Sequence, residues 1–262
     1  MSQPIDQNLI TIERLEKTYT TTRGEMVHAL QDINLRIREG EFVTVVGPSG
    51  CGKSTLLKIL GGLLAKSSGR ISLKGTPVDG PRRDIGIIFQ TPVLLPWYTV
   101  LDNTLLPIRV LGLERNQYVD RARELLHLVG LEGFEHRYPF ELSGGMQQRN
   151  AITRALIHDP AILLMDEPFG ALDAMTRETM NLELLRIWQE AKKTVFFITH
   201  SIPEAVFLAD RVIVMSARPG TVLQEIPVCL PRPRDLDMMG LPEFVEAART
   251  IRHLLSVKGA LD

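Results

Sequence analysis

Short apolar runs and helical patterns alternate along the first part of the chain. Residues 33–37 alternate between apolar and polar side chains, which predicts a half-buried strand. Residues 42–46 are a continuous run that predicts a buried strand, and it ends at a glycine-rich turn. Residues 53–64 carry apolar side chains at helical spacing. Two further short strands are predicted at 70–74 and 85–89.

The pattern becomes helical after Thr91 and returns to short strands near residue 161. We interpret residues 92–156 as a helical lobe inserted into an α/β core, with an amphipathic helix at 118–129. The remaining predicted elements alternate between strands at 161–165, 194–198 and 212–215 and helices at 174–191 and 203–209. This β–α–β alternation predicts a mainly parallel sheet that is covered on both faces.

The C-terminal part departs from this alternation. Residues 230–234 read Leu-Pro-Arg-Pro-Arg, which predicts a linker, and residues 242–255 predict an amphipathic helix. The whole chain has 262 residues, which fits one large α/β domain with a smaller inserted lobe.

Composition and charge exclude several classes of protein. The 30 basic and 31 acidic residues give a formal charge of −1, which argues against a dedicated nucleic-acid binder. No apolar run approaches the ~18 residues needed to span a bilayer, and the N-terminus has no signal-peptide pattern. We therefore expect an intracellular protein that meets a membrane only through a partner. Two cysteines are too few for a disulfide framework.

A glycine-rich segment follows the strand predicted at 42–46. It matches the phosphate-binding pattern G-x-x-x-x-G-K-[ST] and consists of Gly47, Pro48, Ser49, Gly50, Cys51, Gly52, Lys53, Ser54 and Thr55. Its glycines let successive backbone N–H groups face one anion, and the following helix start adds partial positive charge. We expect Lys53 to reach the β- and γ-phosphates of ATP and the Ser54 hydroxyl to ligate Mg²⁺. For Cys51 we favour a small filler over a redox role.

Two carboxylates end the apolar strand at 161–165. Asp166 is predicted to hold Mg²⁺ through its water shell, and Glu167 to polarise the attacking water. Alone, this pattern is weak, because a strand that reaches solvent can end in the same way. The phosphate-binding segment makes the catalytic interpretation the stronger one.

A second anion-binding pattern decides the class. Residues 142–149 read Leu-Ser-Gly-Gly-Met-Gln-Gln-Arg, and this segment resembles the signature of the ABC ATPase family, with Met146 in place of the usual Gln. Ser143 can cap a helix that runs to about residue 156, and Gly144 and Gly145 expose N–H groups at its start. Two phosphate-binding helix starts in one chain predict two copies placed head to tail, each closing over the other's nucleotide.

The resemblance implies a fold and further site residues. The implied fold is a P-loop NTPase core of α/β class, with an antiparallel β portion near the N-terminus and an inserted α-helical subdomain. Its nucleotide-binding domain would span residues 8–230, followed by a linker and helical tail at 231–262. The implied roles are adenine stacking by Tyr19, contact with Mg²⁺ and water by Gln90, contact with the partner copy by Asp173, and contact with the γ-phosphate by His200.

Each of these residues also has a plainer interpretation. A lone Tyr19 is ambiguous, Gln90 could be a buried amide, and a histidine at a strand end such as His200 is more often structural.

The resemblance also implies partners. They are a second copy of the chain, a membrane permease contacted near residues 90–97, and, indirectly, a solute-binding protein; nucleic acid is not expected. Trp97 is expected to remain partly exposed for the permease, although it could instead pack within the lobe. The implied location is the cytoplasmic face of a bacterial membrane, with the chain bound peripherally.

Four segments are similar to the nitrate, sulfonate and taurine importer branch, at residues 94–97, 100–103, 216–220 and 230–234. Ser201 departs from the usual Asp and is found in members linked to pyrimidine-precursor or aromatic-acid uptake. The alternative is an ABC ATPase that drives a non-import process, such as a force-transmitting or lipoprotein-release system.

Overall fold

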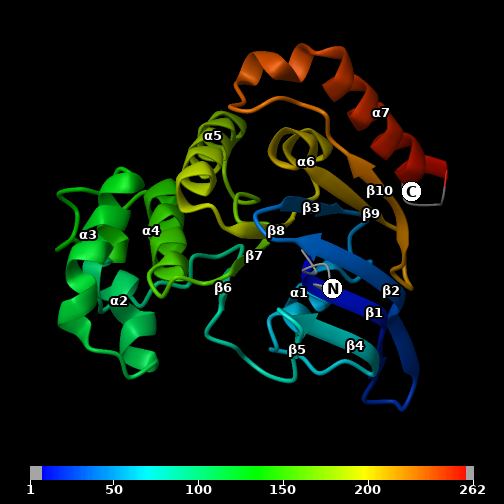
Figure 1. The fold of residues 1–262 in the computed structure, drawn as a ribbon, viewed down its shortest axis with the longest axis horizontal. Helices are drawn as coiled ribbons and strands as arrows, with labels where there is room; N and C mark the ends of the chain where they lie inside the picture. The colour runs from blue at the N-terminus through cyan, green and yellow to red at the C-terminus, as the bar shows by residue number, and fades with distance from the viewer. Residues whose placement is uncertain (1–7, 258–262) are drawn as a thin grey trace, which may run out of the picture. The chain divides into compact units, whose positions relative to one another are not determined.

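The computed structural model describes residues 8–257, which form two compact units (Figure 1). The first unit contains the described parts of Met1–Arg82 and Thr194–Asp262, and the second contains Arg83–Lys193. Each unit is described separately. None of the helices within residues 8–257 is long and apolar enough to cross a lipid bilayer.

An antiparallel sheet of order β2-β1-β4-β5 lies in the first unit. Its strands are β1 (Asn8–Thr20), β2 (Met26–Arg38), β4 (Ser68–Leu73) and β5 (Thr76–Pro77). This sheet confirms the antiparallel portion expected near the N-terminus. The pattern of β1 was not recognised as a strand because bulges interrupt its register with β2, and Arg14 has a positive φ of 46°.

The parallel core of the first unit is built on β3 (Phe42–Val46). This strand pairs in parallel with β8 (Thr194–Ile198) on one side and β9 (Arg211–Met215) on the other. All five residues of β3 and of β8 are buried, which is why both read as continuous apolar runs. Strand β10 (Val222–Pro227), which the sequence pattern did not predict, pairs antiparallel with β9.

Three helices accompany these strands: α1 (Lys53–Leu60), α6 (Ile202–Leu208) and α7 (Pro242–Val257). The prediction that α1 would reach residue 64 was wrong. Gly61 caps the helix, and Gly62 follows with a positive φ of 68°, at a point where a Cβ would overlap the backbone of Gly80. The chain turns there because only glycine fits such a close approach of two backbone segments.

The second unit combines a parallel strand pair with helices. Strand β6 (Ile85–Ile88) pairs in parallel with β7 (Ile162–Asp166). The helices are α2 (Val100–Val110), α3 (Val119–Leu128), α4 (Gly144–Leu156) and α5 (Ala174–Ala191). Helices α2 and α4 share a buried polar cluster, in which the Asn150 amide donates to the Thr104 hydroxyl at 2.8 Å. The predicted lobe of 92–156 lies inside this unit.

The segment predicted as a linker is tied to the end of α6. Arg232 donates to the Leu208 carbonyl at 2.8 Å and pairs with Asp210. Arg234 donates to the Phe207 carbonyl at 2.7 Å and is only 6% exposed. Burial lowers the pKa of Arg234 to about 10, so its guanidinium remains charged at neutral pH. Two arginines thus bind carbonyls that a helix end leaves without an intrahelical partner.

We predict that Arg234→Ala lowers the free energy of unfolding by about 2 kcal/mol, because buried carbonyls of α6 lose a charged donor. Urea denaturation followed by circular dichroism measures the change. The control is Arg252→Ala on the exposed face of α7, which should shift stability by less than about 0.5 kcal/mol. Equal shifts in the two variants would contradict the capping role of Arg234.

Candidate functional site

In the first unit, two predicted site segments leave the sheet at the same edge. Val45 of β3 is in register with Ile198 of β8, and the Thr199 amide donates to the Val45 carbonyl at 3.2 Å. The glycine-rich segment follows β3 and His200 follows β8, so both emerge at the carboxyl ends of parallel strands. Ligands of open α/β sheets bind at this edge.

The glycine-rich segment of residues 47–55, here called the phosphate loop, ends in an open helix start. Gly50 and Gly52 have positive φ values of 74° and 108°, and Gly52 is the N-cap of α1. No side chain within residues 8–257 caps this helix start. An anion can therefore bind at this helix start, where the helix dipole adds partial positive charge.

Lys53 lies at the first position of α1 and is 6% exposed. Its ammonium donates to the carbonyls of Gly47 and Pro48, each at 2.9 Å. This folds the side chain back along the phosphate loop and keeps its charge beside the loop backbone. A buried cation next to a helix start is an arrangement suited to phosphate.

Cys51 fills the inside of the phosphate loop. Its side chain is buried, and a Cβ on Gly47 would lie 2.9 Å from its Sγ. Burial raises the pKa of the thiol, although the charges of Lys53 and Arg218 act against that rise. The thiol is therefore protonated at neutral pH, as expected of a filler rather than a reactive cysteine.

Tyr19 lies beside the start of α1. Its hydroxyl is 3.3 Å from the Thr55 hydroxyl, and the ammonium of Lys17 lies 5.0 Å from its ring centroid. The ring is 38% exposed. An exposed aromatic face near the phosphate loop can stack on a base, and the adenine contact of Tyr19 stays a prediction.

The residues around His200 are held by hydrogen bonds on both sides. Thr199 donates its hydroxyl to the buried carboxylate of Glu204 and accepts the Ser201 amide at 3.0 Å. Ser201 is the N-cap of α6 and accepts the Glu204 amide at 3.4 Å. Serine and aspartate are equally good N-caps, which gives a physical reason why Ser201 can replace the usual Asp. His200 itself is exposed.

The second unit brings together Gln90, Asp166 and Glu167. Gln90 follows β6 and the two carboxylates lie at the end of β7, with Ile88 and Met165 in register. A Cβ added to Gly170 would lie 3.2 Å from the Gln90 Nε2 and 3.7 Å from the Glu167 Cβ. Glu167 has a positive φ of 46°, which is uncommon outside glycine and clusters at functional sites.

Ser143 and Asp173 line one cavity of about 280 Å³ in the second unit, together with Gly144 and Gly145. Each of the two polar residues caps a helix. Ser143 accepts the Met146 amide at 3.3 Å at the start of α4, and Asp173 accepts the Thr176 amide at 3.0 Å at the start of α5. Hydrogen bonds from Thr176 lower the pKa of Asp173, which therefore stays ionised.

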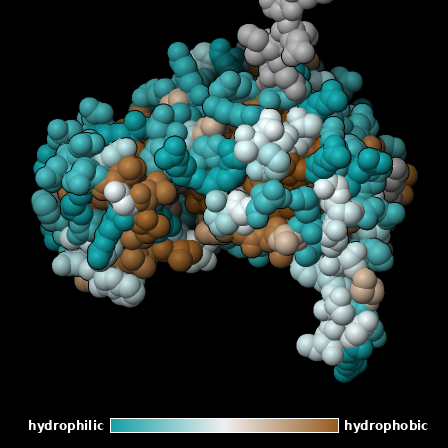
Figure 2. Space-filling model, turned by 60° about the horizontal axis from the view of Figure 1, so that its bottom comes forward, coloured by the Kyte–Doolittle hydropathy of each residue, from teal (hydrophilic) through white to brown (hydrophobic). Residues whose placement is uncertain are grey.

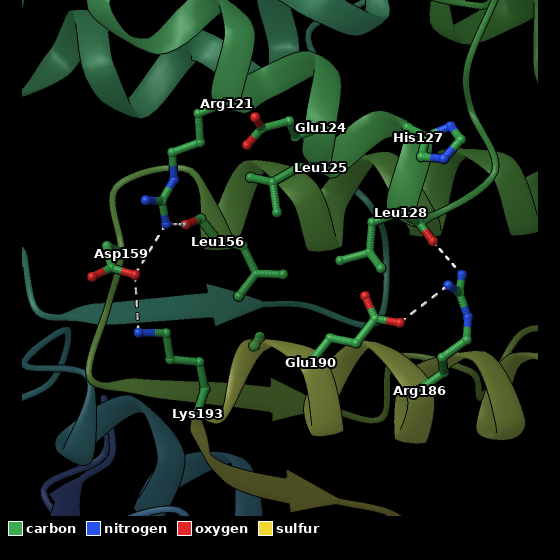
Figure 3. Close-up of a pocket in the computed structure, with 11 residues that line it drawn as sticks. Arg121, Glu124, Leu125, His127, Leu128, Leu156, Asp159, Arg186, Glu190 and Lys193 are labelled. Atoms are coloured by element: carbon green, nitrogen blue, oxygen red, sulfur yellow. Dashed lines mark hydrogen bonds and ion pairs between the residues drawn. The ribbon is translucent and has the colours of Figure 1, made fainter.

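Another cavity of about 490 Å³ in the same unit contains none of the predicted site residues, all of which lie in the described part of the chain (Figure 3). Leu125 and Leu128 point into it. At one end, Asp159 accepts from Arg121 at 3.0 Å and from Lys193 at 2.9 Å. Arg186 and Glu190 form a further ion pair along it, and we assign this cavity no part in the chemistry.

The local sequence around Arg218 indicates only the similarity of residues 216–220 to the importer branch and predicts no contact with the phosphate loop. In the structure, the guanidinium of Arg218 donates to the Gly50 carbonyl. The local sequence does not predict this contact, because 168 residues separate Arg218 from Gly50. Glu204 was missed for a related reason: its carboxylate reads as a surface group in sequence, yet it is only 7% exposed.

The family described as ABC transporter matches residues 30–170. The taurine import ATP-binding protein TauB of Rhizobium johnstonii is 45% identical over 260 residues, covering 94% of this chain and 96% of the relative. The aliphatic sulfonates import ATP-binding protein SsuB of Bacillus cereus is 46% identical over 226 residues, covering 86% and 88%.

A solved structure agrees with these matches. It is the dimeric, post-hydrolysis state of the ATP-binding cassette MJ0796 bound to ADP and Pi, with 36% identity, a TM-score of 0.72, and coverage of 83% of this chain and 98% of that one. The fold and the site thus define a P-loop ATPase. The chain belongs to the ABC transporter family and is an ATP-hydrolysing ABC subunit.

We predict that Ser143→Ala lowers the free energy of unfolding by about 1 kcal/mol, because α4 loses its N-cap. Ser143→Gly is the matched variant and should cost only a few tenths of a kcal/mol, roughly, since glycine is a tolerated N-cap. Urea denaturation of both variants measures the difference. Equal losses would show that the Ser143 hydroxyl does not hold the start of α4.

Proposed function

We propose that this chain is the ATP-hydrolysing subunit of an ABC importer of the taurine and sulfonate type, and that it couples ATP binding and hydrolysis to solute uptake through a separate permease. The observation that carries the proposal is the presence of two anion-binding helix starts in one chain, at Lys53 of α1 and at Gly144 of α4. The printed names of TauB and SsuB support the importer type.

ATP binding is assigned to the phosphate loop and its neighbours. The open N–H groups at Gly52 and Lys53 receive the phosphates, the Lys53 ammonium neutralises the β- and γ-phosphate charge, and Tyr19 stacks on adenine. Ser54, Asp166 and Gln90 offer a hydroxyl, a carboxylate and an amide oxygen. Such hard oxygen donors suit Mg²⁺, which keeps several waters beside them and beside phosphate oxygens.

Hydrolysis is assigned to Glu167, His200 and Gln90. The Glu167 carboxylate accepts a hydrogen bond from the attacking water, and Gln90 beside it orients the same water. His200 contacts the γ-phosphate. Catalysis of this kind consists of positioning and charge stabilisation rather than covalent chemistry. The positive φ of Glu167 supports this assignment, because the backbone holds a strained conformation at the carboxylate.

A second copy of the chain is the first proposed partner. Ser143 caps the start of α4, and Ser143, Gly144, Gly145 and Asp173 line one cavity there. In a head-to-tail pair, this end of one copy closes over the γ-phosphate held by the other. The dimeric arrangement stated for MJ0796 supports such a pair.

The permease is the second proposed partner, and the chain would bind it at the cytoplasmic face of the membrane. Apolar side chains are exposed over the part of the molecule formed by α2, α3 and α4, on the left in Figure 2. Trp97 is 68% exposed and Val93 is 56% exposed. The Asn103 side chain fixes the intervening backbone by bonding Leu95 on both its N–H and its carbonyl. A rigid segment with an exposed Trp suits a partner helix.

The solute is proposed only as a class. The names of the relatives state taurine and aliphatic sulfonates as the imported solutes. Because Ser201 replaces the usual Asp, pyrimidine precursors and aromatic acids stay alternative solutes. The solute-binding protein and the permease select the solute, since the ATPase subunit acts on ATP alone.

We predict that Glu167→Gln retains Mg²⁺-dependent ATP binding, forms a stable dimer with Mg·ATP, and lowers steady-state turnover by at least about 100-fold, because the amide cannot polarise the water. Phosphate release measures turnover, and gel filtration measures the dimer. The control, Glu246→Gln on α7, should hydrolyse ATP at the wild-type rate. Retained turnover in Glu167→Gln would contradict the role of this carboxylate.

We predict that Trp97→Ala leaves ATP hydrolysis by the isolated subunit unchanged and abolishes ATP-dependent uptake in vesicles that contain the whole transporter. The reason is that the variant removes an exposed aromatic contact without touching the phosphate loop. Val245→Ala on α7, which also removes an exposed apolar side chain, is the control and should transport normally. Normal uptake by Trp97→Ala would refute a coupling role for this residue.

A further inference from the structure

The loop between β9 and β10, residues 216–221, packs directly against the phosphate loop. The Gly220 amide donates to the Ala29 carbonyl and the Gly220 carbonyl accepts the Gln31 amide, each at 3.0 Å, so the loop is fixed to β2. A Cβ on Gly220 would overlap the carbonyl oxygen of Cys51. The two backbones therefore touch at a point where a side chain cannot be accommodated.

The same loop reaches the preceding carbonyl of the phosphate loop through Arg218. The Arg218 guanidinium donates two bonds to the Gly50 carbonyl, from Nη2 at 3.1 Å and from Nε at 3.3 Å. Two consecutive carbonyls of the phosphate loop, those of Gly50 and Cys51, are thus contacted by one loop, which we call the brace loop (residues 216–221).

The brace loop is internally rigid. The Ser216 hydroxyl donates to the Pro219 carbonyl at 3.0 Å and accepts the Thr221 amide at 2.9 Å. The Ser216 amide also donates to the Thr221 carbonyl at 3.0 Å. Arg218 lies within this closed turn, so hydrogen bonds hold the backbone that carries its guanidinium.

The contact with Gly50 fixes a peptide group that shapes the phosphate loop. The carbonyl of Gly50 and the N–H of Cys51 belong to one planar trans peptide and point in opposite directions. Arg218 holds the carbonyl, and the Cys51 amide donates to the Pro48 carbonyl at 3.3 Å. Rotation of this peptide would break both interactions. Gly50 has a positive φ of 74°. Because glycine has many accessible conformations, this peptide would be free to rotate without such contacts.

The guanidinium also adds charge. Arg218 is exposed and donates to the Gly50 carbonyl, whereas Lys53 is buried and donates to the carbonyls of Gly47 and Pro48. Both charges act to lower the pKa of the Cys51 thiol, against the larger effect of burial, which raises it. Two cations beside the same loop favour the binding of an anion there.

We propose that Arg218 is a positioning residue of the nucleotide site: it locks the Gly50–Cys51 peptide of the phosphate loop and adds positive charge, so that the loop is preorganised for the phosphates of ATP. The inference rests on the proposed ATP-binding role of the phosphate loop. Preorganisation acts on ground-state binding, because the peptide is ordered before the nucleotide arrives. It leaves the chemical step at Glu167 unaffected.

The test compares the purified full chain with Arg218→Gln, Arg218→Lys and the control Arg249→Gln, an exposed arginine of α7. Calorimetric titration with ATP and Mg²⁺ gives Kd, and steady-state hydrolysis gives KM and kcat. We expect Arg218→Gln to raise Kd and KM about fivefold, and kcat to change by less than about twofold. Arg218→Lys should recover part of the affinity, because it keeps the charge but loses the two-donor geometry.

The control should bind and hydrolyse ATP as the wild type does. Wild-type affinity in Arg218→Gln, or a fall in kcat at unchanged KM, would overturn the positioning role while leaving the ATPase assignment intact. A wild-type chain that binds no ATP would overturn the proposed function itself, and the role of Arg218 with it. Thermal unfolding of each variant confirms that all four proteins are folded.

Discussion

The open start of α1 is the constraint on which the rest of the structure depends. A helix start leaves N–H groups without intrahelical partners, and most helices fill them with a side-chain cap. Here Gly52 occupies the N-cap, and no side chain among residues 8–257 takes that place. The cost of this exposed end is offset only when an anion arrives. Three features fix the conformation of the phosphate loop before this helix start: strand β3, the buried Lys53 and the closely packed glycines.

The capped helix starts complement the open one. Ser143 and Asp173 close the first turns of α4 and α5 with their own oxygens, yet both side chains border a cavity in the second unit. Each residue therefore stabilises its helix and also lines the cavity. In the second unit, as in the first, the chemically important residues follow the carboxyl ends of parallel strands, where Gln90 and Glu167 meet around Gly170. Strand direction thus places residues that are far apart in sequence.

Much of this could be predicted from sequence because the relevant signals are local. The α/β class, the buried strands and the Ser143 cap follow from apolar runs and from the residues next to them. The alternation of apolar and polar residues does not predict strand β1, because bulges interrupt it. The predicted length of α1 was wrong because the helix ends where Gly62 lies against the backbone of Gly80. The contact of Arg218 with Gly50 is also non-local. Residue roles such as that of His200 come from family resemblance and stay predictions.

The arginines that follow β10 have a consequence for how the chain tolerates damage. Arg232 and Arg234 take the place of the hydrogen bonds that a further turn of α6 would have made. Proteolytic cleavage between residues 228 and 231 would remove both donors together, and with them α7, although every residue of the phosphate loop would remain. The Leu208 and Phe207 carbonyls would then lose their arginine donors and would have to accept hydrogen bonds from water, although the side chains around them are apolar. A nicked protein would thus keep its nucleotide-binding residues and still lose the support of the helix that begins just after His200.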